Sequence, residues 1–252
     1  LNYGSLPRYN EIGTQTGLTT ANDVMLQAGA GRNYMGKYKF GANAKLIVSQ
    51  LGDATSAGMA FDLAAMWVDT AHNVNVSLNV NNIGFQFKPY RKNNQEFLPL
   101  DVQLSFSHRL KHVPFRFIVT AHHLYQWDIR YDNPNVQTQT SSIFDDEKEV
   151  KPAVKAIDNI FRHLTFGGEI YIGKIITLGF AYNHLRRSEL ALPSYGGLAG
   201  FSFGAGIHIN RFTLHYGFAK YALPSSVNHL TLNIDLGKSI KYKRKKKPSK
   251  ND

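Results

Sequence analysis

The chain has 252 residues, of which 43% are hydrophobic and none is cysteine, and its formal net charge is +11 at pH 7. No window approaches the run of about 18 apolar residues that a transmembrane helix needs. The lack of cysteine excludes a disulfide scaffold and thiolate chemistry. Residues 238–252 hold eight Lys or Arg and one Asp, which leaves +4 for the rest of the chain. We expect a disordered basic tail there, with contact to anionic lipid or a partner as the alternative, and no binding to nucleic acid.

Residues 1–22 are polar and rich in Gly and Thr, and they include Pro7. They predict a loop, or part of a strand whose partners lie upstream. The residues that follow Leu1 show no basic start, apolar segment or cleavage site, so we expect no signal peptide among them. We therefore expect a processed form or an amino-terminally truncated fragment.

From residue 23 to 237 the chain alternates bulky apolar residues with small or polar ones, and this period of two predicts β-strands. The clearest alternation lies within Lys174–Gly237. The segments 23–32, 37–50, 56–68, 73–87, 97–110 and 115–129 follow the same pattern. A polar loop over 131–156 and a short helix over 157–164 interrupt it. In all we expect about eleven strands.

The chemistry of the two strand faces allows a soluble sheet or an outer-membrane barrel. Strands of roughly 10 to 15 residues exceed the five or six that are typical of globular sheets, and a tilted barrel strand needs about 9 to 11. Aromatic residues near strand ends, such as Trp67 and Tyr182, are typical of an interfacial girdle. We predict an all-β, antiparallel transmembrane β-barrel over residues 23–237. Because closed single-chain bacterial barrels have an even number of strands, we expect further strands before Leu1.

No catalytic, cofactor or metal site is expected, so the protein is not predicted to be an enzyme. The acidic residues of the loop over 131–156 lack the ligand pattern of an EF-hand. His122 and His123 are adjacent, which places them on opposite faces of an extended strand rather than on one metal. No nucleophile elbow is present.

Two groups of charged residues are the candidate functional positions. Arg186, Arg187 and Glu189 lie at a strand end, where two guanidinium groups could hold a carboxylate or a lipid phosphate. The alternative is an Arg–Glu network that fixes the adjacent loop. A second group is predicted to face inward, with its cations paired to its carboxylates: Lys39, Lys45, Arg109 and Arg116 with Asp62, Asp235 and Glu169.

Several stretches in order resemble the PorQ family of the type IX secretion system, whose members are FadL-like outer-membrane barrels. The matching stretches are GANAKLIVSQLGDATSAGMAFDLAAMW at Gly41–Trp67, LPLDVQLSFSHRLKHVPFRFIVT at Leu98–Thr120, FRHLTFGGE at Phe161–Glu169, YNHLRRSEL at Tyr182–Leu190, GLAGFSFGAGI at Gly197–Ile207 and the following FTLHYGFAKY. The resemblance implies about 14 strands in the full protein. It also implies an outer-membrane scaffold in contact with lipid, a PorZ-like surface protein, a PorU-like sortase and a PorV-like barrel.

The role that the resemblance implies is to anchor these partners while secreted cargo is processed and attached to lipopolysaccharide. The second candidate function is a FadL-like transporter of hydrophobic small molecules. A transporter needs an apolar pocket inside the barrel, whereas the predicted inward residues are Asn, Ser, Gly, Thr and charged groups. The sequence therefore favours the scaffold.

Overall fold

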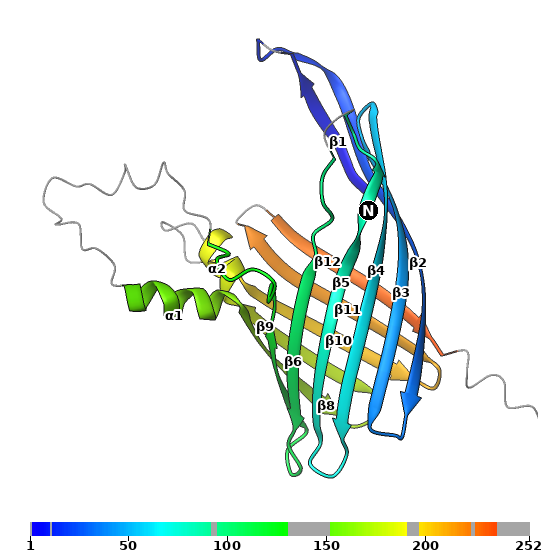
Figure 1. The fold of residues 1–252 in the computed structure, drawn as a ribbon, viewed down its shortest axis with the longest axis vertical. Coiled ribbons are helices and arrows are strands. Elements are labelled where there is room, and N and C mark those ends of the chain that lie inside the picture. Colours follow the sequence, from blue (N-terminus) through cyan, green and yellow to red (C-terminus); the bar gives the residue numbers. More distant parts are fainter. Residues whose placement is uncertain are drawn as a thin grey trace, which may run out of the picture.

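The computed structural model describes residues 2–10, 12–91, 95–130, 152–190, 197–222 and 225–235. Within them the chain forms one antiparallel sheet in which each strand pairs with its neighbours in sequence (Figure 1). The twelve strands are β1 (Asn2–Tyr9), β2 (Gln15–Tyr34), β3 (Tyr38–Leu51), β4 (Ala54–Asp69), β5 (Val74–Lys88), β6 (Asp101–Arg109), β7 (Phe115–Ala121), β8 (Leu164–Ile172), β9 (Ile176–Asn183), β10 (Phe201–Ile209), β11 (Phe212–Ala222) and β12 (Ser225–Ile234). Among the described residues β1 and β12 do not pair, so the sheet is open.

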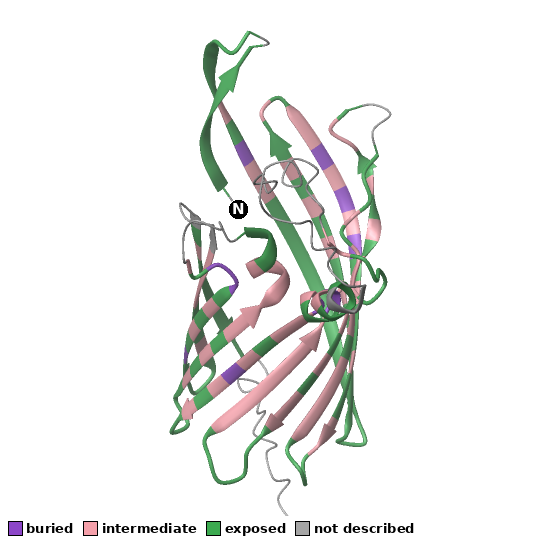
Figure 2. Ribbon diagram, turned by 90° about the vertical axis from the view of Figure 1, so that its left-hand side faces the viewer, coloured by how far each residue is buried: buried purple, intermediate pink, exposed green. Residues whose placement is uncertain are grey.

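The sheet curls, so one face is concave and the other convex, and its two faces differ in polarity. On β3, Asn43, Lys45 and Ser49 are partly buried on the concave face, while Phe40 and Leu46 on the convex face are 52% and 44% exposed. Figure 2 shows the same alternation of exposed and intermediate residues along neighbouring strands. This polarity is the reverse of a water-soluble sheet, whose apolar face would be buried.

A conventional hydrophobic core is absent from the described part of the molecule. Its buried hydrophobic residues are Ala21, Ala60 and Ala199, and no large side chain is fully buried. Bulky residues of many strands are exposed instead, including Phe61, Leu178 and Phe203. Hydrogen bonds between strands therefore hold the sheet together, and its convex face offers a broad apolar surface.

The connections between strands differ at the two ends of the sheet. At one end, called the turn end, the connections are 35–37, 70–73, 110–114, 173–175 and 210–211. At the other end, called the loop end, they include 89–100, 122–163 and 184–200. The loop end carries both helices, α1 (Pro152–Arg162) and α2 (His184–Leu190), as Figure 1 shows. No described helix has the length and apolar character to span a membrane.

A β-bulge in β5 reverses the phase of the strand. Asp62 of β4 lies opposite two residues, because the register moves from Phe61↔Ile83 to Leu63↔Val80. Asn82 adopts a φ of 60°, and its backbone N–H donates to Asp62 Oδ1 at 2.9 Å. Even-numbered residues of β5 therefore face outward before the bulge and odd-numbered residues after it.

The boundaries differ from the sequence-based ones at both the beginning and the middle of the chain. The segment predicted as a loop, or as a strand with upstream partners, forms β1 and the start of β2, and these pair with each other. Every residue of β1 is exposed, so no alternation marks it in the sequence. The structure thus has twelve strands within the described residues rather than about eleven.

In the middle of the chain, β7 and α1 also have bounds that differ from the predicted ones. Strand β7 ends at Ala121 rather than at Ile129, since His123 has a φ of 55° and turns the chain away. Helix α1 covers Pro152–Arg162 instead of 157–164. Of the polar loop predicted over 131–156, residues 152–156 belong to α1 instead, and residues 131–151 lie outside the described residues, as does the predicted basic tail 238–252.

Candidate functional site

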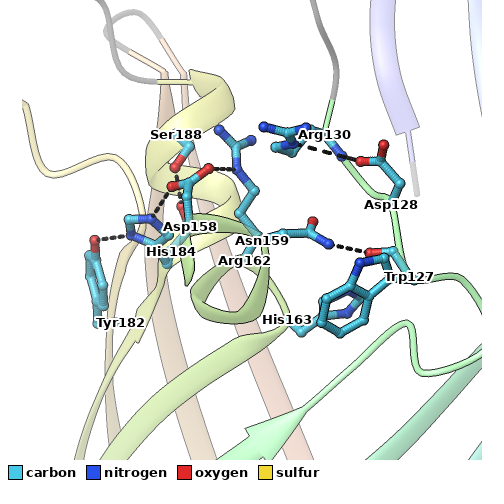
Figure 3. Close-up of polar contacts among 10 residues, drawn as sticks. All are labelled: Trp127, Asp128, Arg130, Asp158, Asn159, Arg162, His163, Tyr182, His184 and Ser188. Carbon is cyan, nitrogen blue, oxygen red and sulfur yellow. Dashed lines mark hydrogen bonds and ion pairs between the residues drawn. The ribbon is translucent and has the colours of Figure 1, made fainter. Parts of the chain in front are cut away.

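Helices α1 and α2 form a helical cap at the loop end, joined by the carboxylate of Asp158 (Figure 3). Arg162 Nε donates to Asp158 Oδ2 at 2.7 Å, and His184 Nε2 lies 3.2 Å from Oδ1. The His184 Nδ1 atom lies 3.0 Å from the hydroxyl of Tyr182, at the end of β9. Partial burial raises the pKa of Asp158, but the hydrogen bonds from Arg162 and His184 outweigh it and hold the pKa below its ordinary value. The ionised carboxylate therefore ties α1 to α2.

A second contact anchors the end of α1 to the segment after β7. The ring of His163 places Nδ1 2.8 Å from the carbonyl oxygen of His122 and Nε2 2.9 Å from that of Trp127. The side-chain amide of Asn159 donates to the same Trp127 oxygen, as Figure 3 shows. Both Asn159 and His163 are buried. These contacts supply hydrogen-bond donors to two backbone carbonyl oxygens of the loop that follows β7.

His122 and His123 lie side by side, contrary to the expectation of opposite strand faces. Their Nδ1 atoms are 2.7 Å apart, because β7 ends at Ala121 and the backbone of His123 is left-handed, so neither residue lies in an extended strand. The Asn183 amide nitrogen lies 3.3 Å from His122 Nε2 and can only donate, so this Nε2 is the acceptor and the proton sits on Nδ1. Burial, followed by the coulombic interaction with His123, lowers the pKa of His122 to about 4. His122 is therefore neutral at pH 7.

A polar cavity of about 540 Å³ lies between α2 and the concave face of β6–β10. Strand residues form one side and α2 contributes the other. The polar residues that line it are Asp101, Gln103, Thr120, His122, His123, Thr165, Asn183, Arg186, Glu189 and Ser202. Many are already hydrogen-bonded to each other: Asn183 donates to Thr165 Oγ1 at 2.8 Å and accepts from the Arg186 backbone N–H at 2.8 Å. The cavity suits polar groups or water rather than an apolar ligand.

The structure separates the two arginines that were expected to share one ligand. Arg186 and Glu189 line the polar cavity. Arg187 instead donates through Nη1 to the carbonyl oxygen of Gly197 and so fastens the chain that follows α2. Neighbouring helix residues point in different directions, which explains the separation. Gly200, at a φ of 86°, packs against this turn, where a Cβ would lie 2.8 Å from Arg187 Cβ.

The concave face brings Lys45 and Asp62 together, as the alternation predicts. Lys45 Nζ lies 2.7 Å from Asp62 Oδ2, and both side chains are largely buried. Lys45 also donates to Asn82 Oδ1 at 3.0 Å, and Asn43 donates to Asp62 Oδ2 at 3.0 Å. This cluster, called the bulge network, ties the β5 bulge to β3 and β4.

A second charged cluster lies near the turn end of β6–β8. Arg116 Nη1 lies 3.3 Å from Glu169 Oε2, as expected for that pair. The guanidinium of Arg109 lies over the Tyr171 ring, 4.5 Å from its centroid, rather than on a carboxylate. Tyr171 in turn donates its hydroxyl to Glu169.

Two of the predicted inward charges lie outside these clusters. Lys39 is exposed near the turn end, and within the described residues it is not joined to Asp62, Glu169 or Asp235. Asp235 follows β12, where its backbone N–H donates to the carbonyl oxygen of Arg211 at 2.8 Å. The ion-pair network is therefore two separate clusters rather than one continuous chain of charges.

We expect the helical cap to loosen as the pH falls from 6.5 to 4. Because the pKa of folded His122 is about 4 against 6.5 ordinarily, the folded state binds fewer protons than the open state in this window. The stabilisation by neutral His122 is complete above pH 6.5 and is lost as the pH falls through the window. Asp158 remains ionised there because its pKa is lowered.

Hydrogen exchange of the α1 amides, corrected for intrinsic rates, measures this loosening. Protection should fall between pH 6.5 and 4 in the wild type and change much less in His122→Gln, which cannot titrate. An equal pH dependence in the two proteins would assign the effect to another group.

Comparison with protein-family models and with curated proteins finds no match for this chain. Sequence reasoning missed four residues that lie in the two helices or directly after α1, outside the period-two pattern of the strands: Asp158, Asn159, His163 and His184. Only the His122–His123 pair is visible as a motif, and its geometry depends on the turn at His123.

Proposed function

We propose that this chain forms the wall of an outer-membrane β-barrel that acts as a non-enzymatic scaffold. The observation that supports this best is the reversed polarity of the sheet, with bulky apolar side chains exposed on the convex face and polar ones partly buried on the concave face. In water, an apolar surface of this extent favours aggregation. In a bilayer the same surface faces lipid, and the polar face lines or fills the lumen.

A row of aromatic residues supports a membrane interface near the turn end. Tyr34, Tyr38 and Trp67 lie directly opposite one another on β2, β3 and β4. All three are exposed on the convex face. Tyr and Trp favour the headgroup level, where the ring is partly apolar and its polar atom reaches water. This aromatic row therefore fits one edge of the apolar band.

The two edge strands of the open sheet, β1 and β12, bear on whether the full protein forms a closed barrel. Unpaired backbone groups on β1 and β12 cannot face lipid, since nothing there satisfies their hydrogen bonds. A FadL-like barrel of about 14 strands provides the missing pairing. We propose this closed architecture for the full protein.

The longest connections, 89–100, 122–163 and 184–200, all lie at the loop end, whereas every connection at the turn end is short, and this asymmetry matches the extracellular and periplasmic ends of outer-membrane barrels. On this orientation the helical cap faces the outside. We propose that the cap and neighbouring loops dock a PorZ-like surface protein beside PorU-like and PorV-like components of the type IX secretion system. The identity of these partners rests on the sequence resemblance, and the role is anchoring during cargo maturation and attachment to lipopolysaccharide.

A transporter of hydrophobic molecules is less well supported. The cavity beneath α2 is lined mostly by polar side chains, and the one on the concave face of β2–β4 includes Gln27, Asn43 and Asp62. Neither offers the apolar lining that a fatty ligand needs.

Affinity purification of the tagged full-length protein from outer-membrane fractions of its native host tests the proposal. We expect co-purification of a surface protein with sortase components, and loss of that surface protein when α2 is replaced by a Gly–Ser linker of equal length. Recovery in the outer membrane with bound fatty acid and no surface partner would favour the transporter. Recovery outside the membrane fraction would refute the barrel.

A further inference from the structure

The convex face has an apolar hollow of about 640 Å³ across β2–β5. Two rows of residues that lie opposite one another in the sheet form it. One row runs from Ala30 through Ala42 to Leu63, and the next from Arg32 through Phe40 to Ala65. The small side chains lie beside large ones, so Ala30, Ala42 and Ala65 leave a depression between Phe40 and Leu63.

Arg32 gives this hollow a charged end. It is an exposed cation on the apolar face, one row from the aromatic row of Tyr34, Tyr38 and Trp67. No carboxylate pairs with Arg32 within the described residues. A cation on the lipid side of a barrel is tolerated near the interface, where its guanidinium can reach a headgroup.

We propose that the hollow binds one membrane phospholipid, with an acyl chain against the apolar floor and the headgroup phosphate on Arg32. This inference rests on the proposed membrane location. A guanidinium donates two parallel hydrogen bonds to a phosphate, which matches the ligand to the charged end of the hollow. The apolar part of the hollow lies on the side of Arg32 away from the aromatic row, toward the bilayer interior. A lipid in this orientation therefore places its headgroup phosphate at Arg32 and its acyl chain along the apolar part of the hollow.

A free phosphate ion fits the hollow less well, because only one cation faces it and the remaining lining is apolar. A water-soluble protein partner has no access to a surface that faces lipid. The phospholipid is the occupant that uses both the charge and the apolar lining.

Tryptophan fluorescence reports on this site directly. The chain has two tryptophans, Trp67 beside the hollow and Trp127 near the helical cap. The full-length protein, with every tryptophan except Trp67 replaced by phenylalanine, is refolded into phosphatidylcholine vesicles that contain increasing fractions of phosphatidylglycerol with brominated acyl chains. Bromine quenches the Trp67 fluorescence on contact. We expect saturable quenching at a low fraction of the brominated lipid.

Two substitutions and a matched control separate the site from general lipid contact. Arg32→Gln should raise the fraction needed for half-maximal quenching by about fivefold. Ala42→Leu fills the hollow and should lower the plateau, whereas Ala44→Leu, on the same face of β3 but outside the hollow, should change neither. Far-UV circular dichroism confirms folding of each variant.

The remaining outcomes show whether only the proposed lipid site is wrong or whether the proposed membrane location is wrong as well. Quenching that rises in proportion to the brominated fraction, equally in all variants, would refute the site and keep the barrel in the membrane. If inorganic phosphate alone displaced the brominated lipid, the ligand of the hollow would be a free anion and the lipid proposal would be wrong. If brominated phosphatidylcholine also fails to quench Trp67, both proposals fall.

Discussion

Ala44→Arg is expected to lower the free energy of unfolding from a phospholipid bilayer by about 2–4 kcal/mol. Ala44 lies on the convex face of β3, opposite Phe61 and six residues from Tyr38 of the aromatic row. A barrel strand crosses the bilayer in about 9 to 11 residues, so Ala44 sits near its middle. An arginine there has to leave water for hydrocarbon.

Ala64→Arg is the matched control, with the same substitution on the adjacent strand but on the opposite face. Ala64 is exposed on the concave face and lines a cavity of about 470 Å³ that includes Asn43 and Asp62. The new guanidinium there meets polar groups and water, and we expect a change below about 1 kcal/mol. If this sheet faced water on both sides, both positions would be solvated and both substitutions would be nearly neutral.

Each variant, folded in phospholipid vesicles, is unfolded with guanidinium chloride while its tryptophan fluorescence is recorded. The unfolding curves give the free energy of unfolding of each variant. A large loss for Ala44→Arg alone identifies the convex face as the lipid face. Similar small losses for both variants would contradict the membrane location, and a large loss for Ala64→Arg alone would reverse the assignment of the faces.

Lys45→Met is expected to destabilise the sheet by about 3 kcal/mol, because it leaves the Asp62 carboxylate charged without its cation. The two side chains are only 15% and 16% exposed, so water replaces the lost ammonium poorly. Asp62 also accepts the backbone N–H of Asn82 in the β5 bulge at 2.9 Å. The loss should therefore be accompanied by faster hydrogen exchange around Asn82.

The double variant Lys45→Met with Asp62→Asn provides the control. The asparagine removes the unpaired charge and keeps an oxygen for the Asn82 N–H, so we expect it to recover roughly half of the lost stability. Equilibrium unfolding of the wild type, both single variants and the double variant gives the coupling energy. A double variant less stable than Lys45→Met alone would show that the ion pair does not hold the bulge.

The alternation of residues by itself determined which side chains share a face. It placed Lys45 and Asp62, or Arg116 and Glu169, on the same side of neighbouring strands, and the structure pairs both. Alternation succeeds here because side chains in a strand point to opposite faces with a strict period of two. Local sequence therefore decides orientation wherever the strand is regular.

The tertiary structure decided the features that depend on contacts between distant segments. The bulge at Asn82 needs Asp62 from the preceding strand to hold it, and β1 has no amphipathic pattern because all its residues are exposed. The helical cap forms only when Asp158 meets His184, twenty-six residues later in the chain. The separation of Arg186 from Arg187 likewise follows from the helix that contains them. Period-two patterns carry no information on these arrangements, since each is set by which loop and strand ends meet once the sheet has curled.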